Sequence, residues 1–167
     1  MLFLLFQLGQ DRYALEAGLV VEVLPLVALK GLPGAPRGVA GLVDYRGTPI
    51  PVLDLNALAV GVAAAARVST RLLIVRYQSG QNAERSLGLV VERATEMLKC
   101  AAEDFRTTGV ETGGAPYLRE VVRDRQGLIQ RVDVSAMLGD ELRAALFDKT
   151  PAGGTSVIRT ASSAVAP

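Results

Sequence analysis

The sequence lacks most of the residues from which enzyme active sites are built. Its 167 residues include no histidine and one cysteine, Cys100. Without histidine, Ser-His-Asp and Cys-His nucleophilic sites and most zinc sites are excluded. Neither GxGxxG nor GxxxxGK[ST] occurs, so nucleotide and dinucleotide phosphates have no recognisable binding loop. We therefore predict that the protein is not an enzyme and has no catalytic residues, no cofactor and no metal.

A carboxylate-dependent hydrolase is the enzyme alternative that remains. It would use acidic neighbours such as Glu103-Asp104 or Asp140-Glu141. Acidic pairs at helix starts usually complement the helix dipole, and we interpret both pairs in this way. Cys100 is interpreted as a small packing residue, because no histidine is present to activate its thiol.

The chain also lacks a strong charge of one sign and a long apolar run. Lys and Arg total 18 against 17 Asp and Glu, a net charge of +1 that gives no attraction to nucleic acid or an anionic membrane. No run approaches the roughly 20 apolar residues of a spanning helix. Residues 1–16 lack the basic start of a signal peptide. A lone thiol fits a reducing compartment, so we expect a soluble cytoplasmic protein with no nucleic-acid partner and no membrane insertion.

Short runs rich in Val, Ile, Leu and Tyr recur along the chain and predict a mostly β protein. The runs cover residues 3–8, 12–16, 19–24, 48–55, 70–78, 87–98 and 127–134. Turn residues at 8–12 and 78–85 each lie between two runs and predict hairpin loops. One helix is expected within residues 134–147, with 140–147 as its better half because Gly139 interrupts the pattern.

The two halves of the chain share a plan. Residues 4–24 resemble residues 72–98 if Glu22 is aligned with Glu92, and residues 50–58 resemble 129–137 with Asp54 aligned with Asp133. This period is too long for a solenoid repeat, and it suits two related small barrels. We expect one domain of two such subdomains over residues 1–148. Residues 149–167, rich in Gly, Ser, Thr, Ala and Pro, are expected to be a disordered tail.

Two prolines stand inside the run Thr48–Leu55, although each lacks the N–H that a sheet requires. In an extended chain Pro49 and Pro51 remove donors from the same side of the strand. The strand should therefore begin at a sheet margin and pair fully farther along. Arg46 and Gly47 precede it, and the glycine favours a turn with positive φ that would present Arg46.

These residues carry a resemblance. The stretch "VVEVLPL", then "LPGAPRGVAGLVDYRGTPIPVLDL" and "LGLVVERATEML", is similar to the CheW family of chemosensory coupling proteins from about Phe3 to Phe147. The resemblance implies two intertwined five-stranded SH3-like barrels with a hydrophobic core between them, followed by a short C-terminal helix. It implies an adaptor that joins the cytoplasmic tips of methyl-accepting chemoreceptors to the regulatory domain of the histidine kinase CheA.

The resemblance also implies site residues. The receptor-binding candidates are Val20, Glu22, Gly41, Arg46 and Met97, and Val23 is the kinase-binding candidate. A planar guanidinium at Arg46 suits a place beside a carboxylate such as that of Glu22. Each candidate has a structural alternative. The two apolar receptor candidates could be ordinary core, the glycine a backbone requirement, and the Arg46–Glu22 pair an internal brace.

Two positions depart from the family pattern. Asn56 stands where the family often has arginine, and Tyr45 stands where it has leucine. Tyrosine is favoured at interfaces. The "DYRG" stretch is also similar to coupling proteins of Wsp-type surface-sensing systems.

A functional alternative is a structural array component that binds receptors without regulating a kinase.

Overall fold

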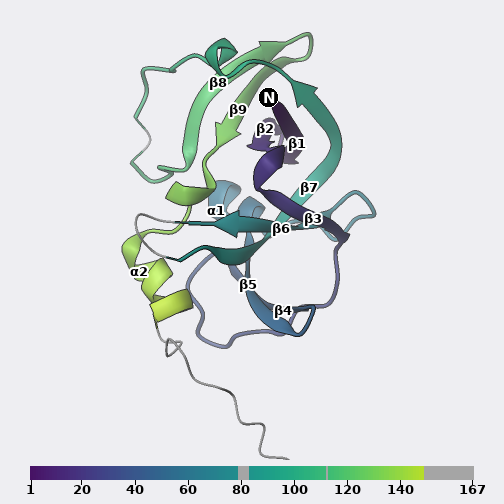
Figure 1. Ribbon diagram of the computed structural model, residues 1–167, viewed down its shortest axis with the longest axis vertical. Helices are drawn as coiled ribbons and strands as arrows, with labels where there is room; N and C mark the ends of the chain where they lie inside the picture. Colours follow the sequence, from purple (N-terminus) through teal and green to yellow (C-terminus); the bar gives the residue numbers. More distant parts are fainter. Residues whose placement is uncertain (79–82, 112, 149–167) are drawn as a thin grey trace, which may run out of the picture.

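Strand pairing arranges the chain as two sets of five strands that share one long strand, β7 (Arg85–Lys99). The computed structural model describes residues 1–78, 83–111 and 113–148. Figure 1 shows one set above the other. The upper set contains the C-terminal half of β7 with β1 (Leu2–Leu8), β2 (Asp11–Glu16), β8 (Leu118–Asp124) and β9 (Gly127–Val132). The lower set contains the N-terminal half of β7 with β3 (Val20–Pro25), β4 (Val39–Tyr45), β5 (Thr48–Asp54) and β6 (Arg71–Tyr77).

Both sets have the same strand order and the same directions. The lower order is β3, β6, β7, β5, β4, and the upper order is β7, β1, β2, β9, β8. In each set the third and fourth strands are parallel and the other neighbours are antiparallel. Isolated bridges, Lys30 to Leu42 and Arg106 to Val121, join the segment after the first strand to the last strand. This pairing is consistent with a small barrel in each set, and the mostly β prediction is confirmed.

The register supports one half of the predicted alignment and corrects the other. Asp54 and Asp133 occupy equivalent places at the C-terminal end of the fourth strand of each set, and each caps a helical turn. We followed the paired residues from Asp54 and Asp133 across each set to its first strand. In this register Glu96, and not Glu92, occupies the position of Glu22. The alignment of Glu22 with Glu92 was wrong because it followed the shared Val-Val-Glu run, which does not occupy equivalent places in the two sets.

The proline-containing strand lies where its missing donors are tolerated. β5 pairs with β4 along its length, from Thr48 to Leu53, but with β7 from Val52 to Asp54. Pro49 and Pro51 therefore precede the segment that is paired on both sides. The prediction that this strand begins at a sheet margin is confirmed.

The helical segments are short. They are α1 (Leu55–Val60), α2 (Asp140–Arg143), the π-helical turn Ala144–Asp148 and the 3₁₀ turns Ala17–Leu19, Ala102–Asp104 and Val134–Ala136. The helix predicted over 140–147 is confirmed, with Gly139 as its N-cap. Helix α1 was not predicted. The expected 8–12 hairpin loop joins β1 to β2, the 78–85 loop lies partly outside the described residues, and the 149–167 tail lies wholly outside them.

Three apolar clusters fill the interior formed by the described residues. Phe3, Leu5 and Ile129 belong to a cluster from the upper set, whereas Leu72 and Ile74 belong to one from the lower set. The third and largest cluster takes residues from both sets, among them Leu4, Phe6, Leu73, Val75 and Leu89. Successive residues of β1 and β6 thus alternate between their own cluster and the shared one. Because both faces of these strands are buried, their sequences read as continuous apolar runs.

Candidate functional site

The hairpin between β4 and β5 presents Arg46 to solvent. Its turn has two residues, Arg46 at φ 52° and Gly47 at φ 82°. Turns with both central residues at positive φ match the twist of antiparallel strands. The Asp44 carboxylate accepts a hydrogen bond of 2.9 Å from the Gly47 N–H. The predicted turn is confirmed, and the Arg46 side chain is 76% exposed.

Glu22 lies beside this hairpin. Its Oε2 accepts a hydrogen bond from the Tyr45 hydroxyl and lies 3.4 Å from Nη2 of Arg46. The Arg46 guanidinium carbon lies 5.2 Å from the centre of the Tyr45 ring, within cation–π range. The hydrogen bond to Glu22 raises the pKa of Tyr45. We call these three residues the Glu22–Tyr45–Arg46 cluster; it brings together two of the residues predicted from the family resemblance.

The equivalent place in the upper set is built differently. There Glu96 occupies the position of Glu22 and Asp124, the last residue of β8, occupies that of Tyr45. Arg12 from β2 joins them, with two contacts of 2.8 Å to Asp124 and one of 3.9 Å to Glu96. The Arg12 side chain is 14% exposed. The hydrogen bonds from Arg12 lower the pKa of Asp124, and the same bonds raise the pKa of Arg12.

Arg12 and Arg46 therefore differ: Arg12 braces the inside of the structure, whereas Arg46 is exposed at the surface. Arg12 is largely buried and bidentate, which is the geometry of a strong internal ion pair. Arg46 is mostly exposed, and within the described residues its guanidinium has one carboxylate contact, longer than the roughly 2.7–2.9 Å of a charge-assisted hydrogen bond. Exposed pairs of this kind contribute little to stability. The Arg46 guanidinium is therefore largely accessible to solvent.

The other predicted residues lie in different surroundings. Gly41 has φ 145°, and a Cβ there would lie 2.3 Å from the carbonyl oxygen of Lys30. The alternative that this glycine is required by the backbone therefore has direct support. Val20 is half-buried and packs against the shared cluster. Val23 and Met97 are 44% and 50% exposed, so Met97 is not a core residue.

Strand β3 has an apolar outer face. Val23 is the one residue of this face that the sequence resemblance predicts as a binding residue. Its exposed positions alternate with half-buried ones and are occupied by Val21, Val23 and Pro25. Val21 is 50% exposed. Contiguous exposed apolar side chains often mark interaction surfaces. The alternation Val-Glu-Val around Glu22 could have revealed this face.

Asn56, the departure noted after β5, has a structural role. It is buried, its Oδ1 accepts from the Gly9 N–H at 2.9 Å and its Nδ2 donates to the Val62 carbonyl at 2.8 Å. It fastens the β1–β2 turn to the segment after α1. The acidic pairs lie in first helical turns as interpreted, and burial raises the pKa of the Cys100 thiol.

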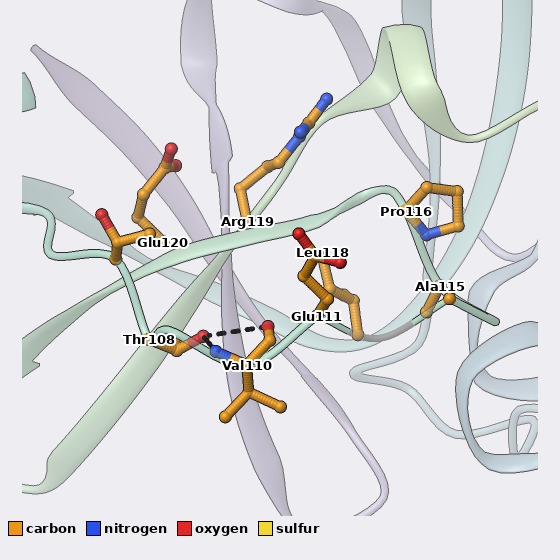
Figure 2. Close-up of a pocket in the computed structure, with 10 residues that line it drawn as sticks. Thr108, Val110, Glu111, Ala115, Pro116, Leu118, Arg119 and Glu120 are labelled. Carbon is orange, nitrogen blue, oxygen red and sulfur yellow. Dashed lines mark hydrogen bonds between the residues drawn. The ribbon is translucent and has the colours of Figure 1, made fainter.

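A hollow of about 310 Å³ lies between β8 and the loop before it (Figure 2). In the loop, the Thr108 hydroxyl lies 3.3 Å from the Val110 carbonyl and 3.2 Å from the Val110 nitrogen. Arg119 also lines the hollow, but its guanidinium is held 3.0 Å from Asp133. None of the six predicted residues lines this hollow.

Neither a metal cluster nor a spanning helix is present in the described part of the chain. Among residues 1–78, 83–111 and 113–148, no three carboxylate or thiol side chains gather closely enough to hold a metal ion. No helix within the same residues has the length and apolar character needed to cross a bilayer.

Comparison with known proteins gives the family. A family model for the CheW-like domain matches residues 2–142. The chain belongs to the CheW-like domain family. This CheW-like chain is 22% identical over 141 residues to the chemotaxis protein CheW of Klebsiella aerogenes, a match that covers 83% of this chain and 82% of the relative. It is 27% identical over 142 residues to the chemotaxis protein CheW of Treponema pallidum, with 81% of each chain covered.

A solved structure agrees with the fold of the CheW-like chain. The scaffolding protein TtCheW from Thermoanaerobacter tengcongensis superposes with a TM-score of 0.73 and is 21% identical in sequence. The match covers 84% of this chain and 89% of that protein. The CheW-like fold therefore extends over most of the described residues.

Proposed function

We propose that this CheW-like chain is a non-enzymatic adaptor that couples chemoreceptor signalling tips to a CheA-type histidine kinase. Membership of the CheW-like family over residues 2–142 carries the proposal. The absence of histidine from the sequence removes the commonest general base. We place the protein on the cytoplasmic side of the membrane, bound to receptor arrays.

The receptor surface that we propose is centred on Arg46 and Glu22. Arg46 is the exposed cation of the Glu22–Tyr45–Arg46 cluster, and its guanidinium suits recognition of a partner carboxylate. Met97 and Val20 would add apolar contact. Gly41 would act indirectly, because it allows the close approach of Lys30 that holds β4 in place.

The kinase surface that we propose is the outer face of β3. Val23 lies there with Val21, and both side chains are about half exposed. Transient signalling contacts often bury less than about 1,200 Å² in total, so a small apolar face is sufficient. Several weak contacts in one array strengthen one another through effective concentration.

Reconstitution tests the proposal. The chain is mixed with the CheA-type kinase and the receptor tip encoded nearest to it, and kinase autophosphorylation is followed with and without the chain. Receptor-dependent kinase activity that requires the chain is the expected result. Binding of both partners without a change in activity would instead identify a structural array component, and binding of neither would refute the proposal.

A charge reversal locates the receptor surface. Arg46→Glu should weaken receptor binding without a loss of thermal stability. Arg125→Glu is the matched control, because Arg125 is exposed in the corresponding β8–β9 turn. A fall in melting temperature as large as the loss of binding would support the internal brace instead.

A further inference from the structure

Tyr45 and Arg46 share one oxygen of Glu22. The Tyr45 hydroxyl donates to Oε2, and Nη2 of Arg46 approaches the same atom at 3.4 Å. A hydroxyl bound to a carboxylate makes a charge-assisted bond, about twice as strong as a neutral one. The tyrosine is therefore the principal partner of this oxygen, and the arginine is held loosely.

The Tyr45 ring also supports the guanidinium. With the Arg46 guanidinium carbon 5.2 Å from the ring centre, the ring attracts the cation. Arginine carries five N–H donors in a rigid fork. Because the side chain is 76% exposed, the edge that does not face Glu22 is accessible from solvent.

From this geometry we infer that Tyr45 is a positioning residue for partner specificity. Its hydroxyl occupies Glu22 and thereby keeps the Arg46 fork open for a carboxylate of the partner. The inference rests on the proposed function, in which the partner is the receptor tip, and it adds the chemistry recognised: an Asp or Glu side chain bound bidentately. A side chain without a hydroxyl at position 45 could not donate to Glu22, and in this chain Arg46 would then close onto Glu22.

The upper set shows what such closure looks like. At the equivalent place Arg12 binds Asp124 through two contacts of 2.8 Å, and its side chain is 14% exposed. An arginine in that state has few donors left for another molecule. Removal of the Tyr45 hydroxyl should move Arg46 toward the same state with Glu22.

The test measures binding of a soluble fragment that carries the receptor signalling tip. Titration calorimetry compares wild type, Tyr45→Phe and Tyr45→Leu, each first shown by circular dichroism to melt like wild type. We expect the dissociation constant to rise about 3- to 10-fold for Tyr45→Phe and further for Tyr45→Leu, which also loses the ring. An unchanged dissociation constant for Tyr45→Phe would overturn the inference.

A second background separates positioning from direct contact. In Glu22→Gln the neutral amide attracts Arg46 far less, so the further change Tyr45→Phe should weaken binding less than 2-fold. An equal loss in both backgrounds would mean that the hydroxyl does not act through Glu22, and the inference would be wrong.

A measurement without the partner keeps the two proposals apart. In ¹⁵N NMR, rotation about the Cζ–Nε bond of Arg46 should be slower in Tyr45→Phe than in wild type, because the guanidinium then pairs with Glu22. If wild type fails to bind the fragment, the proposed function falls, and the NMR comparison still decides the role of Tyr45. Equal rotation rates in the two proteins would overturn the inference.

Discussion

The two arginines at equivalent ends of the strand sets should differ sharply in their effect on stability. Arg12→Met removes the partner of Asp124 but keeps an unbranched apolar stem, and Arg46→Met does the same beside Glu22. Removal of one partner from a fully buried ion pair costs about 3–5 kcal/mol, and an exposed pair contributes about 0.2–1 kcal/mol. The Asp124 side chain is 26% exposed and keeps a 2.8 Å hydrogen bond from the Gln126 N–H.

These surroundings place Arg12 between the two limits. We expect Arg12→Met to lower the free energy of unfolding by about 2 kcal/mol and Arg46→Met by less than about 0.5 kcal/mol. Urea unfolding followed by circular dichroism measures both. With a slope of about 1–3 kcal/mol per molar, the Arg12 variant should unfold roughly 1 M earlier. Equal costs, or a larger cost at Arg46, would refute the distinction between brace and presented side chain.

Two further perturbations test the packing and the charges. Gly41→Ala should lower the free energy of unfolding by about 2 kcal/mol, since the new Cβ would displace Lys30 and break two backbone hydrogen bonds worth about 1 kcal/mol each; a urea midpoint equal to that of wild type would contradict this. Acid should destabilise wild type more than Arg12→Met. The folded pKa of Asp124 lies below its unfolded value of about 3.9, so its stabilisation is present above that pH and is lost as pH falls through the folded pKa. Urea midpoints of wild type and Arg12→Met, each measured at about pH 7 and about pH 3, give the stability that each protein loses in acid. An equal loss in both proteins would show that the Arg12–Asp124 pair is not the source of the acid sensitivity.

The sequence predicted those elements whose burial leaves a simple pattern. β6 reads as an apolar run because both of its faces are covered. β8, "LREVVRD", was missed because Val122 is its one buried residue and charged residues occupy most other positions. α1 was missed because six residues are too short for a helical period. The capping residues of α1 could nevertheless be recognised in the sequence. Asp54 accepts a hydrogen bond of 3.0 Å from the Ala57 N–H, and Gly61 is the C-cap.

The site was predictable in part for a similar reason. The β4–β5 turn is local, so Arg46 and Gly47 indicated it directly. The closeness of Glu22 and Arg46, 24 residues apart, came from the family resemblance and not from any periodicity. The Arg12–Asp124 pair spans 112 residues and left no local signal. Long-range ion pairs depend on strand order and register, which a single sequence does not specify.

The shared strand β7 has a consequence for synthesis on the ribosome. Every strand of the lower set lies between residues 20 and 91, so that set can close before the rest of the chain emerges. The upper set needs β9, which ends at Val132, to complete the pairing of β2. β1 and β2 are thus made before the lower set but are fully paired after it, and the apolar side chains of Phe3 and Leu5 wait for the rest of their cluster. Folding of these strands during synthesis should proceed from the lower set to the upper one, and β1 and β2 wait longest for their partners.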